Sequence, residues 1–235
     1  MTTFDELEPL EIFSGVFALI FVLTSLFIGL LFLKKYFKTK RKEQLSLGLT
    51  WVLLSSGWWG SAFTFLSIMT FEYAFKEFEY LFLNNVFFVL SILFWIYSFV
   101  HIFYQKKEKV VIVLTSIIIG ATEVVLISLL LIDPFLVGRL NGYFITDSGI
   151  FLLILNILIP VVAFILGVFF SVMSIKHEDP KIRKRGIILL IAFSSLLIGG
   201  IGIVILSDDI VLLSVSRVLL LSSAIEYYVA FFIGH

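Results

Sequence analysis

The feature that most constrains this chain is a series of seven apolar runs, each long enough to cross a membrane. A bilayer core requires about 20 apolar residues per helix. The runs cover residues 12–33, 46–70, 81–104, 110–132, 149–174, 186–206 and 210–233. They and their short connections use nearly all of the 235 residues. The sequence therefore predicts an all-α fold, a polytopic membrane protein whose single domain, residues 1–235, is a seven-transmembrane-helix bundle. We expect it in the cell membrane, with the lipid bilayer as its main partner.

Composition supports this class and excludes several others. Hydrophobic residues make up 60% of the chain and charged residues 14%, whereas soluble domains have about half and about a quarter. Because 17 basic residues balance 17 acidic ones, no surplus of positive charge remains for a nucleic-acid partner. The absence of cysteine excludes disulfides, thiol nucleophiles and Cys-ligated metal centres.

The charged residues alternate between the two sides of the predicted membrane. Three connections, after the runs 12–33, 81–104 and 149–174, hold 14 of the 17 basic residues and four acids. The opposite side holds two basic residues and most acids, among them Asp133, Asp147, Asp208 and Asp209. The positive-inside rule then predicts that the N-terminus lies outside and His235 inside. The basic loops are expected to set topology and contact anionic lipids, or to bind a separate signalling partner in the cytoplasm or the membrane.

Three ionisable residues fall inside the apolar runs, namely Glu123, Arg217 and Glu226. Glu123, Arg217 and Asn156 each lie about 12–15 Å below the outer boundary of their runs, at 1.5 Å per residue. An Arg and a Glu at matched depth are expected to pair, because either charge alone is costly in lipid. Pro160 also leaves the carbonyl of Asn156 without its helical partner.

These residues predict a polar chamber in the outer half of the membrane. Thr64 and the glycine pair Gly199 and Gly200 fall at the same depth as Glu123, Asn156 and Arg217. Trp58 and Trp59 fall near the middle of the bilayer, where they either pack or line an apolar ligand pocket. The predicted ligand-binding residues are Glu123, Asn156, Arg217, Thr64, Trp58, Trp59, Gly199 and Gly200. The alternative is a closed interhelical ion pair, with glycines that only allow close helix approach.

Glu226 is expected to act separately from this chamber. It follows Arg217 by nine residues, which places it about 13–14 Å deeper and roughly on the opposite side of the helix. Ser222 and Ser223, one turn earlier, are its expected hydrogen-bond partners, unless a polar group on another span takes that place. We interpret Glu226 either as a buried structural residue or as a switch element near the cytoplasmic side.

Catalytic motifs are absent from the sequence. His101, His177 and His235 are far apart and form no HExxH-type ligand set, so neither a metal site nor a haem site is predicted. No Gly-x-Ser-x-Gly elbow and no pair of intramembrane aspartates is present. The sequence predicts no enzymatic activity and no cofactor.

The first half of the chain contains two stretches with a distinctive order, LFLKKYFKTKRKEQLSLGLTWVLLSSGWWG and FKEFEYLFLNNVFFVLSILFWIYSFVHIFYQKKEK. In order, they give a basic loop, a Trp-containing helix, a short acidic loop and an aromatic helix. In this order and spacing, the first half of the chain resembles the seven-helix N-terminal sensor region of certain membrane histidine kinases. The sequence has no helical linker and no kinase domain after the last run. The resemblance therefore implies a stand-alone sensing module, or one whose output partner is a separate protein.

The function expected from the sequence is a receptor-like membrane sensor. It binds a small apolar or amphipathic ligand, or it senses the membrane itself. The main alternative is a small transporter or channel that uses Glu123 and Arg217 as substrate or proton-coupling groups. The third is a structural membrane subunit.

Overall fold

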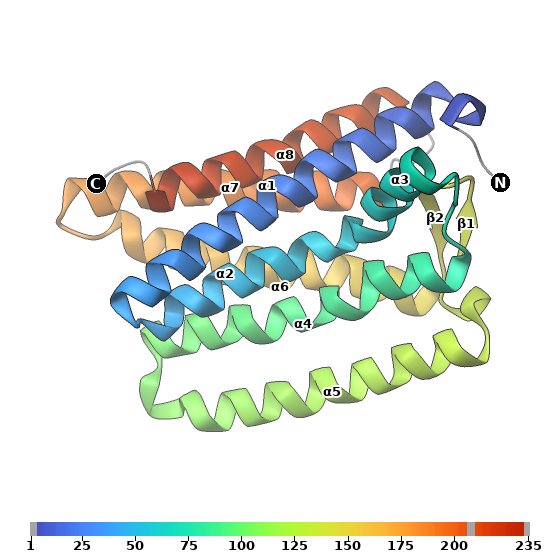
Figure 1. Cartoon of the computed structure of the whole chain (residues 1–235). Helices are drawn as coiled ribbons and strands as arrows, with labels where there is room; N and C mark the ends of the chain where they lie inside the picture. The colour runs from blue at the N-terminus through green and yellow to red at the C-terminus, as the bar shows by residue number, and fades with distance from the viewer. Residues whose placement is uncertain (1–3, 206–209, 233–235) are drawn as a thin grey trace. The chain divides into compact units, whose positions relative to one another are not determined.

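The computed structural model describes residues 4–205 and 210–232 (Figure 1). Seven helical segments in these ranges are long and apolar enough to cross a membrane. The predicted all-α architecture with seven membrane-spanning segments is therefore confirmed. The helices are α1 (Pro9–Thr39), α2 (Lys42–Leu54), α3 (Trp59–Phe71), α4 (Glu77–Phe103), α5 (Glu108–Ile132), α6 (Ile150–Ile175), α7 (Pro180–Ile205) and α8 (Ile210–Phe232).

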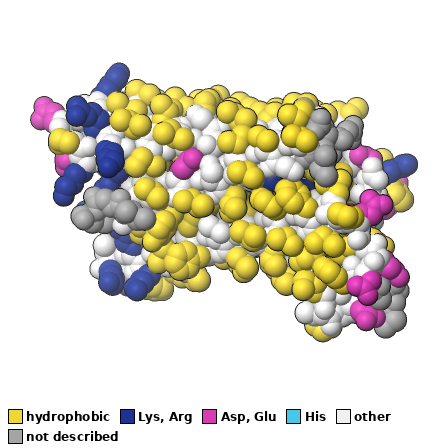
Figure 2. Space-filling model, turned by 90° about the horizontal axis from the view of Figure 1, so that it is seen from above, with side chains coloured by type: hydrophobic (Ala, Val, Ile, Leu, Met, Phe, Trp, Pro, Cys, Tyr) yellow, Lys and Arg dark blue, Asp and Glu magenta, His cyan; other side chains and the backbone are white. Residues whose placement is uncertain are grey.

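The chain forms two compact units, residues 1–154 and 155–235. The first unit contains α1 to α5 and the start of α6, and the second contains the rest of α6 together with α7 and α8. The expected single domain, residues 1–235, stays a prediction. Hydrophobic side chains cover most of the face seen in Figure 2, and most charged side chains on that face lie toward its two ends.

In the first unit, α2 packs against both α1 and α4, and α5 packs against α4. Glycine allows the closest approach between α1 and α2. A Cβ at Gly48 would lie 2.8 Å from Cβ of Phe32 and 3.3 Å from the carbonyl oxygen of Gly29. Contact between these two helices therefore depends on the missing side chain.

The second predicted span is interrupted in its middle. Residues Ser55–Trp58 form a 3-10 helix, η2, between α2 and α3. The apolar run 46–70 gave no sign of this break, because 3-10 and α-helical turns have the same hydrophobic composition. Mid-helix 3-10 segments often mark hinges or strained sequences.

The connection between α5 and α6 contains a hairpin that the sequence analysis missed. Strand β1 (Gly138–Asn141) pairs antiparallel with β2 (Ile145–Ser148), with Gly138 opposite Ser148 and Asn141 opposite Ile145. Gly142, at the start of the turn, has a φ of 70°, which glycine adopts without strain. The Asn141–Gly142 pair was the available signal, since Asn-Gly is the strongest short-range hairpin motif.

In the second unit, α7 and α8 pack along their length. A Cβ at Gly199 would lie 2.7 Å from the carbonyl oxygen of Ser216 and 2.9 Å from the amide nitrogen of Leu220. Pro160 lies inside α6, which remains one helix from residue 150 to residue 175.

Candidate functional site

The β1–β2 hairpin is anchored on one end of the first unit. We call this end the acidic end, because Glu8, Glu11, Glu77, Glu79 and Asp133 lie there, at the starts of α1 and α4 and after the end of α5. Phe144, at the hairpin turn, is only 5% exposed and packs with Leu7, Phe65 and Ile68. The rings of Phe144 and Phe65 meet edge to face at 6.2 Å between centroids. The hairpin is therefore part of the core at this end.

Two carboxylates bind the hairpin backbone. The Tyr143 amide donates to Oε1 of Glu11 at 3.2 Å, and the Leu140 amide donates to Oε1 of Glu77 at 3.1 Å. Glu11 is held in place because its other oxygen accepts the amide of Glu8 at 3.1 Å, closing the first turn of α1. Charge-assisted hydrogen bonds from α1 and α4 thus fix the hairpin.

A chain of buried hydroxyl groups joins the hairpin to the second span. The Tyr80 hydroxyl donates to the carbonyl oxygen of Phe144 at 3.0 Å. Its oxygen lies 2.5 Å from the Ser61 hydroxyl oxygen, on α3. Tyr80 and Ser61 are 1% and 6% exposed, so these bonds are shielded from solvent. These hydrogen bonds link the hairpin turn, α4 and α3 through polar groups that are expensive to leave unpaired.

The break in the second span lies directly beside these hydrogen-bonded hydroxyl groups of Tyr80 and Ser61. The Trp59 amide bonds the carbonyl of Ser56, three residues earlier, which leaves the next amide, Gly60, outside the regular helical pattern. That amide donates to Oδ1 of Asn84 on α4 at 2.5 Å. A Cβ at Gly60 would lie 2.7 Å from that oxygen and 2.8 Å from the Tyr80 carbonyl oxygen. A glycine at 60 and an asparagine at 84 are therefore the pair that this break requires.

Two serines complete the hydrogen bonding of the break. The Ser55 hydroxyl donates to the Val52 carbonyl at 2.7 Å, and the Ser56 hydroxyl donates to the Leu53 carbonyl at 2.6 Å. The Trp59 indole in turn donates to the Ser55 oxygen at 3.2 Å. Side-chain hydrogen bonds thus satisfy backbone groups at the break, as irregular backbone at membrane depth requires.

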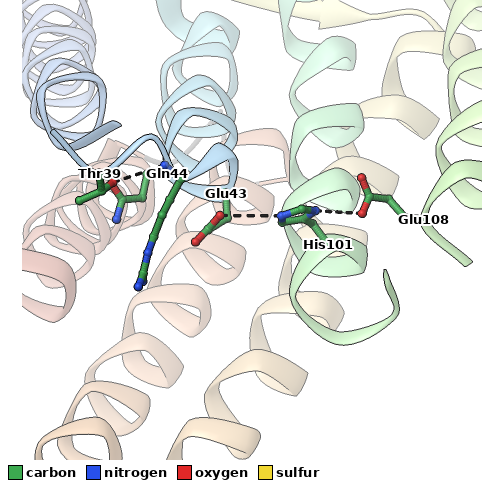
Figure 3. Close-up of polar contacts among 6 residues, drawn as sticks. Thr39, Glu43, Gln44, His101 and Glu108 are labelled. Carbon is green, nitrogen blue, oxygen red and sulfur yellow. Dashed lines mark hydrogen bonds and ion pairs between the residues drawn. The ribbon is translucent and has the colours of Figure 1, made fainter. Parts of the chain in front are cut away.

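We call the opposite end of the unit the basic end, because Lys38, Lys40, Lys42, Lys106 and Lys107 lie there, at the end of α1, the start of α2 and after the end of α4. At this end, His101 lies between two carboxylates (Figure 3). Its Nδ1 is 2.9 Å from Oε2 of Glu108 on α5, and its Nε2 is 3.9 Å from Oε2 of Glu43 on α2. The Tyr97 ring stacks on the imidazole at 5.5 Å between centroids. The Glu43–His101–Glu108 cluster therefore links α2, α4 and α5.

Sequence reasoning did not assign His101 a role. The available signal was that Glu43, His101 and Glu108 are titratable residues at three adjacent helix ends. In the described residues, no group of three or more His, Asp or Glu is arranged to hold a metal ion.

Of the predicted ligand-binding residues in the first unit, Glu123 and Thr64 are buried. Glu123 is 9% exposed, and neither of its carboxylate oxygens has a hydrogen-bond partner among the described residues. Thr64 is fully buried, and its hydroxyl oxygen is likewise without a described partner. Glu123 is on α5 and Thr64 on α3, and each of these helices packs against α4. The chamber that joins the two residues stays a prediction.

Trp58 and Trp59 are both packed. Trp58 meets Phe21 of α1 edge to face at 4.9 Å between centroids, and it borders a small core around Ala18, Val22 and Ala62. Trp59 lies 5.4 Å from the Phe87 ring on α4. Its indole N–H donates to the Ser55 oxygen, one turn earlier in the same span. These contacts favour the packing interpretation over a ligand pocket.

The remaining predicted chamber residues, Asn156, Arg217, Gly199 and Gly200, lie in the second unit. Asn156 and Arg217 are half-buried on α6 and α8. The backbone of α8 occupies the space that Gly199 leaves free, whereas a Cβ added at Gly200 would lie at an ordinary van der Waals distance, 3.8 Å, from Pro160. Since Glu123 belongs to the first unit, its pairing with Arg217 stays a prediction.

The hydrogen bond predicted for Glu226 is confirmed. The hydroxyl of Ser222, which lies one turn before Glu226 on α8, donates to Oε1 of Glu226 at 2.8 Å. The Ser223 hydroxyl instead donates to the Leu220 carbonyl at 2.6 Å. Because α8 is one continuous helix, Glu226 and Arg217 lie on roughly opposite sides of it, as predicted. Asp208, Asp209 and His235 lie outside the described residues.

Comparisons of the chain with protein-family models, with curated proteins and with solved structures found no match.

Proposed function

We propose that this chain is a stand-alone seven-helix membrane sensor, with the β1–β2 hairpin as its input and the break in the second span as the element that moves. The hydrogen-bonded chain from the Phe144 carbonyl through Tyr80 to Ser61 carries the proposal, because it joins the hairpin to the break. A sensor needs two packings of similar free energy, and a 3-10 segment inside a span is a known place for such a rearrangement.

The basic end provides the output in this proposal. The α2 helix runs from the break to Glu43, where the Glu43–His101–Glu108 cluster ties it to α4 and α5. The Ser46 hydroxyl also donates to the Phe94 carbonyl at 2.7 Å, adding a second link between α2 and α4. A change at the break therefore reaches the basic loops through one short helix.

The proposed orientation places the acidic end and the hairpin outside and the basic end in the cytoplasm. It rests on the alternation of basic and acidic connections along the chain. The input is then a small apolar or amphipathic ligand, or the bilayer itself, acting where aromatic side chains border the hairpin. The output surface consists of the basic loops, facing a separate signalling partner.

Hydrogen exchange tests this proposal in nanodiscs. The Tyr80→Phe variant removes the hydroxyl that bonds both Ser61 and the Phe144 carbonyl but keeps the aromatic ring, and it leaves the longer bond from the Ser61 hydroxyl to that carbonyl, at 3.5 Å. We expect faster exchange in the hairpin, at residues 55–61 and in α2. Thr70→Val is the matched control, since the Thr70 hydroxyl bonds only within its own helix, to Leu66. A change confined to the hairpin contradicts the proposal.

A small transporter or channel is the second candidate, and the buried carboxyl of Glu123 favours it. An acidic side chain inside a span without a hydrogen-bond partner is typical of ion and proton pathways. Liposome flux assays separate the two functions. Flux of protons or small solutes that disappears in Glu123→Gln supports the transporter and removes the sensor proposal.

A further inference from the structure

The imidazole of His101 lies within reach of water and between carboxylates of two other helices (Figure 3). Glu43 is in the first turn of α2, and Glu108 is the first residue of α5. The side chains of His101, Glu43 and Glu108 are 28%, 25% and 29% exposed. A proton therefore reaches the imidazole without any opening of the helices, and histidine is the side chain whose charge ordinarily changes between about pH 5 and pH 8.

The two carboxylates lie at different distances from the ring. Nδ1 is 2.9 Å from Oε2 of Glu108, which is a hydrogen-bond distance, whereas Nε2 is 3.9 Å from Oε2 of Glu43, which is not. An ionised carboxylate only accepts hydrogen bonds, so we assign a hydrogen to Nδ1. In the neutral imidazole, Nε2 then carries a lone pair and has no hydrogen to donate to Glu43.

A second proton on the ring changes this geometry. It binds at Nε2 and makes the imidazole a cation with a donor on each side, so the Glu43 carboxylate can accept a charge-assisted hydrogen bond. Such bonds are about 2.7–2.9 Å long, so the two groups have to approach each other by about 1 Å. The Tyr97 ring stacks on the imidazole with 11° between the planes. Because this stacking and the bond to Glu108 hold the ring in place, we expect Glu43 to move.

The movement of Glu43 involves the turn between α1 and α2. The Thr39 hydroxyl at the end of α1 donates to Oε1 of Gln44 at 2.8 Å, so the two sides of the turn are tied together. Three residues after Glu43, the Ser46 hydroxyl donates to the Phe94 carbonyl at 2.7 Å and fixes α2 on α4. The turn and its basic side chains therefore move with Glu43, whereas the rest of α2 stays in place.

The nearest charged groups to the imidazole are the two carboxylates. Tyr97 on α4 presents its ring face to the imidazole, and an aromatic face favours a cation. Exposed basic residues neighbour the cluster in the sequence and oppose a proton on His101, but solvent screens exposed charges. These basic residues are Arg41, Lys42, Lys106, Lys107 and Lys109.

We propose that the Glu43–His101–Glu108 cluster is a proton-binding site that closes the start of α2 onto α4 when the pH falls. With the proton bound, both carboxylates accept hydrogen bonds from the imidazole. Without it, only the bond between α4 and α5 remains, and the turn between α1 and α2 is released. The closed state is thus present at acid pH and is lost as the imidazole gives up its proton. This inference names a regulator of the output end, and only in that role does it rest on the proposed function.

Electron paramagnetic resonance of one spin label at Lys42→Cys, in nanodiscs, tests the proposal. The chain has no cysteine, and Lys42 is exposed and adjacent to Glu43. We expect the label to shift from a mobile to an immobile line shape as the pH falls from about 8 to about 5.5, the range in which histidine gains its charge. As a second measurement, ¹⁵N NMR of labelled histidine should find the His101 hydrogen on Nδ1 at the higher pH.

The His101→Gln and Glu43→Met variants are each expected to abolish the pH-dependent shift, because the first removes the titrating donor and the second removes the acceptor. His177→Gln is the matched control and should keep the shift, since the His177 ring accepts the Asp179 amide in a different connection, at 3.1 Å. An unchanged line shape of the wild-type chain over this pH range overturns the proposal, whatever the folding of the variants.

A pH-dependent shift that persists in His101→Gln also overturns the proposal, as does a His101 hydrogen on Nε2 at the higher pH. The proposed function fails separately, because the Tyr80→Phe exchange experiment reads the coupling between the hairpin and the break and leaves this cluster intact.

Discussion

At the scale of single residues, Gly60 is the position where one side chain decides the packing. Its missing Cβ leaves room for the Asn84 oxygen and for the Tyr80 carbonyl, both within 2.8 Å of where a Cβ would lie. We predict that Gly60→Ala lowers the free energy of unfolding by about 1–3 kcal/mol, the usual cost of overpacking. Thermal unfolding in detergent measures this loss.

The matched control is Gly120→Ala on α5. A Cβ at Gly120 meets nothing within 4 Å, so only the helix propensity changes. We expect the same stability or a gain of about 0.5–1 kcal/mol. Equal losses in the two variants would show that close contact at Gly60 has no special role.

Tyr73, between α3 and α4, gives a prediction about pH. Its hydroxyl donates to Oε2 of Glu79 at 2.7 Å. This hydrogen bond, together with desolvation and the negative charge of Glu79, raises the pKa of Tyr73 above its ordinary value. The neutral hydroxyl is the donor, so the bond persists at moderate pH and is lost as the pH rises through the raised pKa.

We therefore expect Glu79→Gln to lower the pKa of Tyr73. A ¹³C NMR titration of labelled tyrosine measures it, with Tyr73→Phe to assign the resonance. An unchanged titration in Glu79→Gln would show that the carboxylate does not control Tyr73.

At the scale of elements, the break in the second span depends on a residue from another helix. Asn84→Leu leaves the Gly60 amide without its acceptor, which costs about 1–3 kcal/mol for a buried donor. We predict this loss of stability and faster amide exchange at residues 59–61. The control is Asn85→Leu, because the Asn85 amide donates within α4, to Leu81 at 2.7 Å. The interpretation fails if Asn85→Leu is as damaging as Asn84→Leu.

The elements also show what can be predicted from this sequence. The seven spans were found within a few residues of their ends, because bilayer thickness sets the length of an apolar run. Glu226 and Ser222 were paired correctly because helical geometry fixes neighbours four residues apart. The hairpin contacts were not predictable, since Glu11 and Tyr143 are 132 residues apart and no spacing rule joins them. The break was missed because its serine hydroxyls and Asn84 replace helical bonds without changing hydropathy.

At the scale of the whole molecule, the two ends of each predicted span differ in charge. The proposed orientation exposes Asp147 outside and Lys184 inside. We predict that a membrane-impermeant maleimide labels Asp147→Cys but not Lys184→Cys in intact cells, and labels both after permeabilisation. The cysteine-free chain is its own background control. The reversed labelling pattern would place the N-terminus inside and contradict the orientation.

The proposed function requires that the hairpin at the acidic end is coupled to the helix ends at the basic end of the first unit. Pulsed electron paramagnetic resonance between spin labels at Lys42→Cys and Lys109→Cys tests it most directly, since both side chains are exposed and flank the Glu43–His101–Glu108 cluster. We predict that Phe144→Ala, at the far end, shifts the population between two distances, whereas Phe135→Ala, at a half-exposed position, leaves it unchanged. The coupling is absent if folded Phe144→Ala and the wild-type chain give one and the same distance distribution.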